Sequence, residues 1–316
     1  MRRLVLLIVA LLTESTSEQI YFGDTAIGRY NFLATITFQE TAKDVPSPTC
    51  IGTIVTESKV VTSCRCFSSV GNDMRKVRVI GGTVKIYWDD NNPESSKFRQ
   101  IRTPKSWKRH DSCGPGPTLA KGMWEKDYTL ITLNFQFFFG KNLNSAVYLS
   151  ENKEELVTRQ KFFKNNDHRF CKLCWVSGYT ATDYRNNRYN IFSSQMISQE
   201  VEIISDELCI RMYCGEGKNC IDKQVFMRAG LICARARDPK FMICDGDRGT
   251  PLVCQGYVYG YFVGTNDCGN TEKPLIFGEQ SELVSFVNYK VLKSSGIKLD
   301  PHRYIFAVIL LFILID

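Results

Sequence analysis

CDGDRGTPLVC, residues 244–254, is the stretch that decides the fold, and it joins a loop to a strand between two cysteines. The loop half, Asp245–Thr250, is made of acidic residues, glycines, one arginine and one threonine. Glycine and aspartate are typical of tight turns. The apolar half continues into residues 252–264, where β-branched and aromatic residues predict strand structure. We therefore expect a tight loop that is held against a β-sheet core.

The rest of the chain around this stretch also favours strands. Short β-branched and aromatic runs, separated by Gly, Asn, Asp and Pro, predict strands at residues 59–62, 77–88, 128–137, 173–176 and 199–204. Residues 285–292 are expected to form a closing helix with Phe286, Tyr289 and Leu292 on one face. Residues 89–126 are polar and contain four prolines, so we expect long surface loops around one short strand. The sequence predicts an all-β protein, built as two barrels or a sandwich.

Composition limits the class of protein. The chain has 316 residues, 44% of them hydrophobic and 23% charged, which suits one large or two ordinary globular domains. This composition excludes disordered, collagen-like and multi-pass membrane proteins. The formal net charge of +7 favours anionic surfaces, but it lacks the dense basic stripe of a nucleic-acid binder. We expect no nucleic-acid partner.

The amino terminus has the pattern of a secretory signal peptide, residues 1–17. Arg2 and Arg3 precede the apolar run Leu4–Leu12, and small residues follow up to Ser17. The run is too short to span a bilayer; the alternative is a buried core helix. A secreted chain folds in an oxidising compartment, where cysteines form disulfides.

The carboxyl terminus, residues 297–316, has the pattern of a GPI-attachment signal. Ser294 and Ser295 are the candidate acceptors, and a mostly polar spacer leads to the apolar run Tyr304–Ile315. Twelve residues of helix reach about 18 Å, which is short of a bilayer core of roughly 30 Å. The alternative is an unprocessed tail that packs on the protein or enters a membrane.

Six motifs, in order, resemble one known family. They are Ile20-Tyr21-Phe22-Gly23, Cys50-Ile51-Gly52-Thr53-Ile54, Val60-Val61-Thr62-Ser63-Cys64-Arg65-Cys66, Asp127-Tyr128-Thr129-Leu130-Ile131, Cys174-Trp175-Val176-Ser177-Gly178-Tyr179 and the stretch 244–254. With them the chain resembles the chymotrypsin-type serine proteases over residues 20–293. The resemblance implies a peptidase S1-like domain at 18–296. It would consist of two six-stranded antiparallel β-barrels, at about 20–140 and 150–293, and a C-terminal helix.

The resemblance places arginines at two of the three catalytic positions. Arg65 stands where the family has its histidine, Arg248 where it has its serine, and Asp127 keeps the aspartate. Catalysis in this family needs a hydroxyl nucleophile and an imidazole that exchanges its proton near neutral pH. Arginine stays protonated, so it supplies neither. None of the three histidines, His110, His168 and His302, adjoins a triad position in sequence.

Other positions also depart from the family pattern. Met242 replaces the aspartate that selects basic side chains in trypsin-like members, whereas Gly246 retains part of the oxyanion-hole backbone. Activation in the family creates a new amino terminus after a basic residue, and this terminus pairs with the aspartate before the serine. Here Gln19 precedes Ile20, so the pairing of Ile20 with Asp247 is in doubt.

The chain has 13 cysteines, and the same resemblance assigns disulfide partners to most of them. It implies the disulfides Cys50–Cys66, Cys174–Cys254, Cys209–Cys233 and Cys244–Cys268, and Cys214 with Cys220 flank a glycine-containing loop that they would close. Cys64, Cys113 and Cys171 remain, with Cys64–Cys113 as the candidate additional bridge. His168-x-x-Cys171-x-x-Cys174 has metal-ligand spacing, but Cys174 is assigned to a bridge, so we expect no metal and no cofactor.

Two hypotheses describe the altered cleft. In the first, Arg65 forms a salt bridge with Asp127 and Arg248 points to solvent. In the second, one aspartate cannot neutralise two guanidiniums, so a cationic cleft binds a carboxylate, sulfate or phosphate. A basic run in the long loop is either a solvated face or a docking patch for an acidic partner or glycan; it comprises Arg99, Arg102, Lys105, Lys108 and Arg109.

The family resemblance implies a secreted, non-catalytic serine protease homologue that binds an extracellular protein. Inactive members of the family act as cofactors or decoys in protease cascades, immunity and reproductive fluids. Two alternatives remain: a residual or unconventional serine endopeptidase, and a surface-tethered adhesion or anion-binding protein. Contact with a membrane is expected only through the C-terminal lipid anchor.

Overall fold

The structure is a computed structural model of the 316-residue chain. It describes residues 31–38, 47–67, 73–82, 98–115, 124–140, 143, 154, 158, 173–179, 181–185, 188–192, 196–215, 221–237, 243–254, 257–265, 272–279, 283 and 286. The signal peptide, Ile20, the C-terminal tail with Ser294 and Ser295, Met242, and Cys171, Cys220 and Cys268 lie outside these residues.

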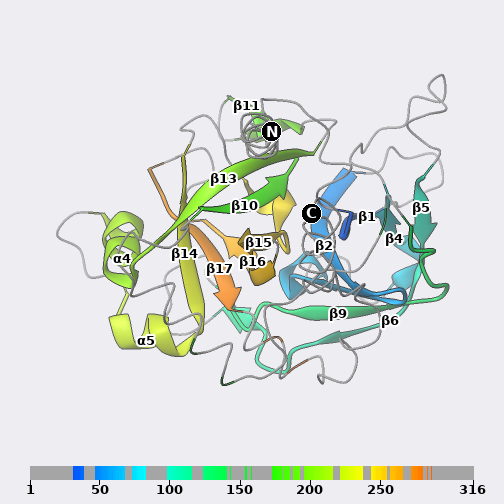
Figure 1. The fold of residues 1–316 in the computed structure, drawn as a ribbon, viewed down its shortest axis with the longest axis horizontal. Helices are drawn as coiled ribbons and strands as arrows, with labels where there is room; N and C mark the ends of the chain where they lie inside the picture. The colour runs from blue at the N-terminus through cyan, green and yellow to red at the C-terminus, as the bar shows by residue number, and fades with distance from the viewer. Residues whose placement is uncertain are drawn as a thin grey trace, which may run out of the picture.

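The C-terminal half forms a closed six-stranded barrel in the order β10-β13-β14-β17-β16-β15. The strands are β10 (Leu173–Gly178), β13 (Ile197–Ile204), β14 (Leu231–Ala236), β15 (Pro251–Cys254), β16 (Tyr257–Gly264) and β17 (Leu275–Glu279). Val176, Val201, Ile232 and Phe277 belong to its buried core. Closure pairs the two edges of the sheet, so no edge of it is left open to other chains. Figure 1 shows this barrel on the left of the molecule.

The N-terminal half forms a seven-stranded sheet in the order β5-β4-β1-β2-β3-β9-β6. The strands are β1 (Leu33–Phe38), β2 (Ser47–Thr56), β3 (Lys59–Thr62), β4 (Val77–Gly81), β5 (Gln100–Arg102), β6 (Pro104–Arg109) and β9 (Thr129–Leu133). The edge strands β5 and β6 are separated only by Thr103. The sheet therefore bends until its two edges meet in one nearly continuous strand. If β5 and β6 are counted as one strand, the seven strands become six, the number that the family resemblance implies for the N-terminal barrel.

The expected strand positions are largely confirmed, although β9 ends at Leu133, so residues 134–137 of the strand expected at 128–137 are not strand. The strand expected at residues 59–62 coincides with β3, and β9 alternates buried and partly exposed residues as a half-buried strand should. The expectation of long loops around one short strand between residues 89 and 126 was wrong. Four strands lie there: β5, β6, β7 (Gly114–Pro115) and β8 (Trp124–Glu125). Pairing of β6 with β9 and of β5 with β4 overrides the polar, proline-containing sequence.

Two short helices pack beside the C-terminal barrel, and the sequence analysis did not predict them. Helix α4 (Asp206–Cys214) begins at Ser205, whose hydroxyl accepts a hydrogen bond from the amide of Leu208. Helix α5 (Lys223–Arg228) begins in the same way at Asp222. Their few apolar contacts, among them buried Cys209 and Phe226, are too short a pattern to predict a helix. Phe286 is the described residue of the closing helix expected at 285–292, and it is helical, as is Leu283 before it; Tyr289 and Leu292 lie outside the described residues.

The two halves share a hydrophobic core. One buried cluster includes Ile51 and Tyr128 from the first half and Tyr179 and Tyr261 from the second. The Tyr128 hydroxyl donates to the carbonyl oxygen of Glu279 over 2.8 Å, and the Tyr179 and Thr35 hydroxyls are hydrogen-bonded. The buried hydroxyls thus find partners across the junction, which fixes the orientation of one half against the other.

Four disulfides are present between described residues. Cys50–Cys66, Cys174–Cys254 and Cys209–Cys233 match the pairs that the family resemblance implies, and Cys64–Cys113 is the candidate additional bridge. Cys214 and Cys244 are also disulfide-bonded. The partners expected for them, Cys220 and Cys268, lie outside the described residues.

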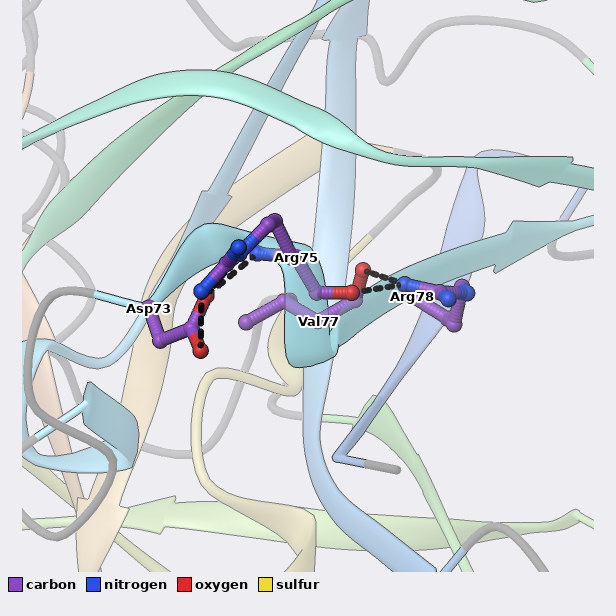
Figure 2. Close-up of polar contacts among 4 residues, drawn as sticks. All are labelled: Asp73, Arg75, Val77 and Arg78. Carbon is purple, nitrogen blue, oxygen red and sulfur yellow. Dashed lines mark hydrogen bonds and ion pairs between the residues drawn. The ribbon is translucent and has the colours of Figure 1, made fainter. Parts of the chain in front are cut away.

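A charged turn leads into β4. The Asp73 carboxylate accepts hydrogen bonds from the amide and the guanidinium of Arg75, and the Arg78 guanidinium donates to the carbonyl oxygens of Arg75 and Val77 (Figure 2). The hydrogen bond from Arg75 lowers the pKa of Asp73, the capping residue of the 3-10 turn Met74–Lys76. Such exposed pairs add little stability. Among the described residues, no helix has the length and apolarity needed to cross a membrane.

Candidate functional site

Asp127 lies at the centre of the site, just before β9. Its side chain is 2% exposed. The Ser63 hydroxyl donates to the carboxylate over 2.7 Å, and the backbone amide of Arg65 donates to the same group over 3.0 Å. Both donors come from the turn that begins at Ser63, directly after β3, and continues into the 3-10 helix η3 (Cys64–Phe67), which contains Arg65. This turn therefore provides a polar cradle for a buried carboxylate, as desolvation requires.

Desolvation raises the pKa of the Asp127 carboxyl above its ordinary value. Hydrogen bonds from Ser63 and from the backbone of Arg65, together with the positive charge of Arg248, oppose this shift but do not cancel it. The structure thus brings Arg65, Asp127 and Arg248 together, as the sequence predicted. An aspartate so enclosed is suited to hold neighbouring groups rather than to meet solvent.

Arg65 approaches Asp127 through its backbone, whereas its guanidinium lies over the Trp124 ring at 5.4 Å from the centroid. Within the described part of the chain, no ion pair joins Arg65 to Asp127. The expected salt bridge is therefore wrong in this respect. The physical reason is that the Ser63 hydroxyl and backbone amides already satisfy the carboxylate, while an aromatic face offers the cation a partner nearer solvent.

Arg248 is buried, with 5% of its surface exposed, and its guanidinium donates to the carbonyl oxygen of Val263. A side chain on Gly264 would lie 2.9 Å from this guanidinium, so the glycine leaves the space that Arg248 occupies. The expectation that Arg248 points to solvent was wrong. Because Arg248 is enclosed, Arg65 is the partly exposed guanidinium of the two, and anion binding by the cleft stays a prediction.

The loop that carries Arg248 is fixed on both sides. The Asp247 carboxylate accepts hydrogen bonds from the amides of Tyr179, over 2.6 Å, and Cys244, over 3.0 Å. Gly249 has φ +85°, and a side chain there would meet the Ile51 carbonyl oxygen at 2.3 Å. Gly246 lies in the 3-10 helix η5 (Asp245–Asp247) of this loop. The buried side chains of Asp247 and Arg248 and the contacts that they make thus hold the loop in place.

The Cys64–Cys113 disulfide lies beside Asp127. The two sulfurs and a carboxylate oxygen of Asp127 lie within 4.8 Å of one another, which is the geometry of a candidate metal site. The two sulfurs are joined to each other, however, and a metal needs thiolates. The same holds for the His168/Cys171/Cys174 motif, since Cys174 is bonded to Cys254 and the other two lie outside the described residues.

His110 is the histidine that the structure describes. Its ring lies 5.3 Å from the Phe286 ring, and its Nδ1 accepts a hydrogen bond from the amide of Ser112 over 3.1 Å. Its contacts are thus with Phe286 and Ser112, not with Asp127. Sequence reasoning missed the roles of Ser63, Trp124 and Val263. Only Ser63 carried a signal, because it lies two residues before Arg65 in a recognised motif.

A family model described as Trypsin matches residues 22–287, most of the chain. The chain belongs to the trypsin family. The matched range includes both halves of the fold and all three central residues of the site, Arg65, Asp127 and Arg248.

Relatives within the trypsin family are distant. Human kallikrein-10 is 25% identical over 250 residues, which are 78% of this chain and 75% of that protein. Human kallikrein-7 is 28% identical over 116 residues, and rat kallikrein-8 is 32% identical over 125 residues. These two alignments cover 36% and 39% of this chain. The chain spans about two-fifths of the length of either relative, 41% in each case.

Solved structures of the trypsin family share the fold. Neuropsin, a serine protease of mouse brain, has a TM-score of 0.58 at 20% identity, covering 84% of this chain and 96% of that one. Human heparin binding protein has a TM-score of 0.58 at 18% identity, covering 85% and 95%. At this identity the likeness concerns the fold.

Proposed function

We propose that this chain is a non-catalytic member of the trypsin family that acts by binding an extracellular protein, as a cofactor or decoy. The observation that carries the proposal is the buried Arg248 guanidinium in the loop where the family has its nucleophile. Its contact with the Val263 carbonyl and its charge near Asp127 give the arginine a structural role. A protonated guanidinium at this point is neither a nucleophile nor a base.

The environment of Asp127 supports the same proposal. In the family's mechanism this carboxylate orients an imidazole. Here its described contacts are the Ser63 hydroxyl and backbone amides, and the ring of His110 has its own partners. A positioned general base within reach of a nucleophile is the first geometric requirement of acyl transfer. No imidazole is among the described contacts of Asp127.

The rival function is a residual serine peptidase, and Ser63 is its one structural argument. Its hydroxyl is 2.7 Å from a carboxylate, the distance of a nucleophile and its base. The Ser63 side chain is buried, however, and both carboxylate oxygens accept from it. Attack on a peptide would require this hydroxyl to give up its buried contacts with the Asp127 carboxylate and the Arg65 amide. The geometry therefore favours a structural role for Ser63.

Active-site labelling tests the proposal. Purified protein is treated with a fluorophosphonate probe beside an active trypsin-family protease as positive control. We expect the control to be labelled and this chain to remain unlabelled. Stoichiometric labelling would contradict the proposal, and loss of that labelling in Ser63→Ala would then identify the peptidase nucleophile.

The proposed location is extracellular, with the chain secreted or held at the cell surface by a lipid. The support is the signal-peptide pattern of residues 1–17 and the acceptor, spacer and apolar run at Ser294–Ile315. Release of the protein from cells by phosphatidylinositol-specific phospholipase C tests the anchor. A Ser294→Leu, Ser295→Leu variant, in which both candidate acceptors are lost, should no longer reach the releasable pool.

A further inference from the structure

Exposed apolar side chains gather on two neighbouring segments of the N-terminal sheet. Six large hydrophobic side chains are exposed among the described residues, and four of them belong to these segments. Phe98 and Ile101 lie at β5, while Phe135 and Phe138 follow β9, with exposed fractions of 76% and 72% for the last two. We call these four residues and Arg102 the aromatic strip. Concentrated exposed apolar surface marks an interaction site more often than scattered residues do.

The backbone under the aromatic strip is fixed. The Gln100 side chain donates to the Phe138 carbonyl oxygen over 2.7 Å and accepts from the Phe138 amide over 2.8 Å. The Arg102 guanidinium donates to the Gln136 carbonyl oxygen over 2.9 Å. Between the exposed rings, Phe137 is buried in the core of the sheet. The two phenylalanines are therefore held outward by a rigid segment.

The two segments that carry the strip contain basic residues and no acidic ones, and one acidic residue, Glu57, lies next to them, since its carbonyl oxygen accepts from the Phe137 amide over 2.7 Å. Residues 98–109 and 134–140 contain five arginines and lysines and no aspartate or glutamate. The Arg102 guanidinium lies 5.6 Å from the centre of the Phe138 ring. The Asn134 side chain donates to the Pro104 carbonyl oxygen, which brings exposed Lys105 beside the strip. Outward aromatic rings are thus bordered by basic residues of the same segments, among them exposed Lys105.

We propose that the aromatic strip binds the surface of an anionic lipid bilayer, with Phe135 and Phe138 entering the interfacial layer and Lys105 facing headgroup phosphates. Apolar side chains that enter the headgroup boundary, combined with basic residues, make up the chemistry of peripheral membrane binding. A sulfated glycan would match the cations but offers little apolar surface for the two rings. The bilayer matches both features, and this inference does not depend on the absence of catalysis.

The test places a reporter in the strip of the full-length chain. Phe135→Trp is compared with Tyr257→Trp, an exposed aromatic position on β16 of the other barrel, using vesicles with brominated acyl chains that quench tryptophan. Because the quenching is local, the C-terminal tail cannot imitate the signal. With phosphatidylserine present, we expect the added tryptophan at 135 to be quenched at least about threefold more than that at 257. In the Phe135→Trp background, Lys105→Gln should weaken binding to these vesicles about fivefold, the effect of one basic residue near an anionic leaflet.

Other results overturn the proposal. Equal quenching at positions 135 and 257, or equal quenching at 135 in neutral and anionic vesicles, excludes lipid binding by the strip. Protection of position 135 by a soluble sulfated polysaccharide, without quenching by vesicles, assigns the strip to a glycan instead. A change from monomer to dimer that is lost in Phe135→Ser, Phe138→Ser, again without quenching, assigns it to self-association. Circular dichroism of each variant, matched to the parent, excludes misfolding as the cause.

Discussion

The turn around Arg65 and the loop around Arg248 each bring an arginine near Asp127, yet they use it differently. The Arg65 guanidinium lies on Trp124 and is partly exposed, while the backbone of Arg65 holds the aspartate. The Arg248 guanidinium is buried and donates to the Val263 carbonyl. The Arg65 side chain therefore lies at the surface of the site, whereas the Arg248 side chain is part of the core.

This difference teaches that one residue type near the same carboxylate has no fixed structural role. Charge in a low-dielectric place must be compensated, and charge near solvent need not be. In the Arg65 turn, the shape is fixed by the Cys64–Cys113 disulfide and by Ser63, independently of the guanidinium. In the Arg248 loop, the side chain itself fills the space beside Gly264. Four variants test this contrast.

Removing the Cys64–Cys113 disulfide should have the largest effect. Its cysteines are 49 residues apart, and closing a loop of that length stabilises a fold by about 4 kcal/mol in the chain-entropy model. We expect Cys64→Ala with Cys113→Ala to lower the free energy of unfolding by about this amount in urea titrations. A loss below about 1 kcal/mol would mean that the Arg65 turn is held by other contacts.

Arg248→Ala should have the second-largest effect and lower the free energy of unfolding by about 3 kcal/mol. The variant leaves the Val263 carbonyl without this donor, opens a cavity and removes a positive charge near buried Asp127. The matched control is Arg235→Ala in β14, where the exposed ion pair with Glu202 is worth less than about 1 kcal/mol. Urea unfolding measures both. Equal losses for the two variants would mean that Arg248 is not part of the core.

Ser63→Ala tests how the Asp127 carboxylate is held. The variant should lower the free energy of unfolding by about 2 kcal/mol near neutral pH, the value typical of a hydrogen bond to a charged group. Burial raises the pKa of Asp127 in the fold, so its unfavourable contribution to stability is absent well below the unfolded value of 3.8, grows as the pH rises from that value to the raised folded value, and is constant above it. Because the lost hydrogen bond favours the charged form, the variant should be destabilised more at pH 7 than at pH 4.

The pH comparison has its own control. Ser106→Ala, an exposed position on β6, should show no pH-dependent difference from the parent chain. If Ser63→Ala lost more stability at pH 4 than at pH 7, the Asp127 carboxyl would not be the group that Ser63 holds. Urea unfolding at both pH values gives the two free energies.

Arg65→Ala should have the smallest effect, below about 1 kcal/mol. A cation over an aromatic ring near the surface contributes about 0.5–1 kcal/mol, and the backbone amide that binds Asp127 is retained in the variant. Trp124 fluorescence should report the lost contact while the unfolding midpoint in urea changes little. A loss as large as that of Arg248→Ala would remove the contrast between the two regions.

Much of the fold was readable from the sequence because it repeats a known pattern. β3 was predicted at its exact residues, and the motifs implied three of the disulfides that the structure contains. The strands β5 and β6 were taken as loop because their residues are polar, and polarity cannot reveal pairing with β4 and β9. Helices α4 and α5 were missed because each buries only a few residues.

The sequence by itself determined the order of the motifs, the trypsin-type fold and the residue types near Asp127, since these depend on chemistry that is written locally along the chain. Only the tertiary structure decided where each side chain points. Ser63, Trp124 and Val263 are up to 200 positions apart, and packing alone brings them to Arg65, Asp127 and Arg248. Burial then fixes which charge is enclosed, because desolvation depends on surrounding atoms and not on neighbours in sequence.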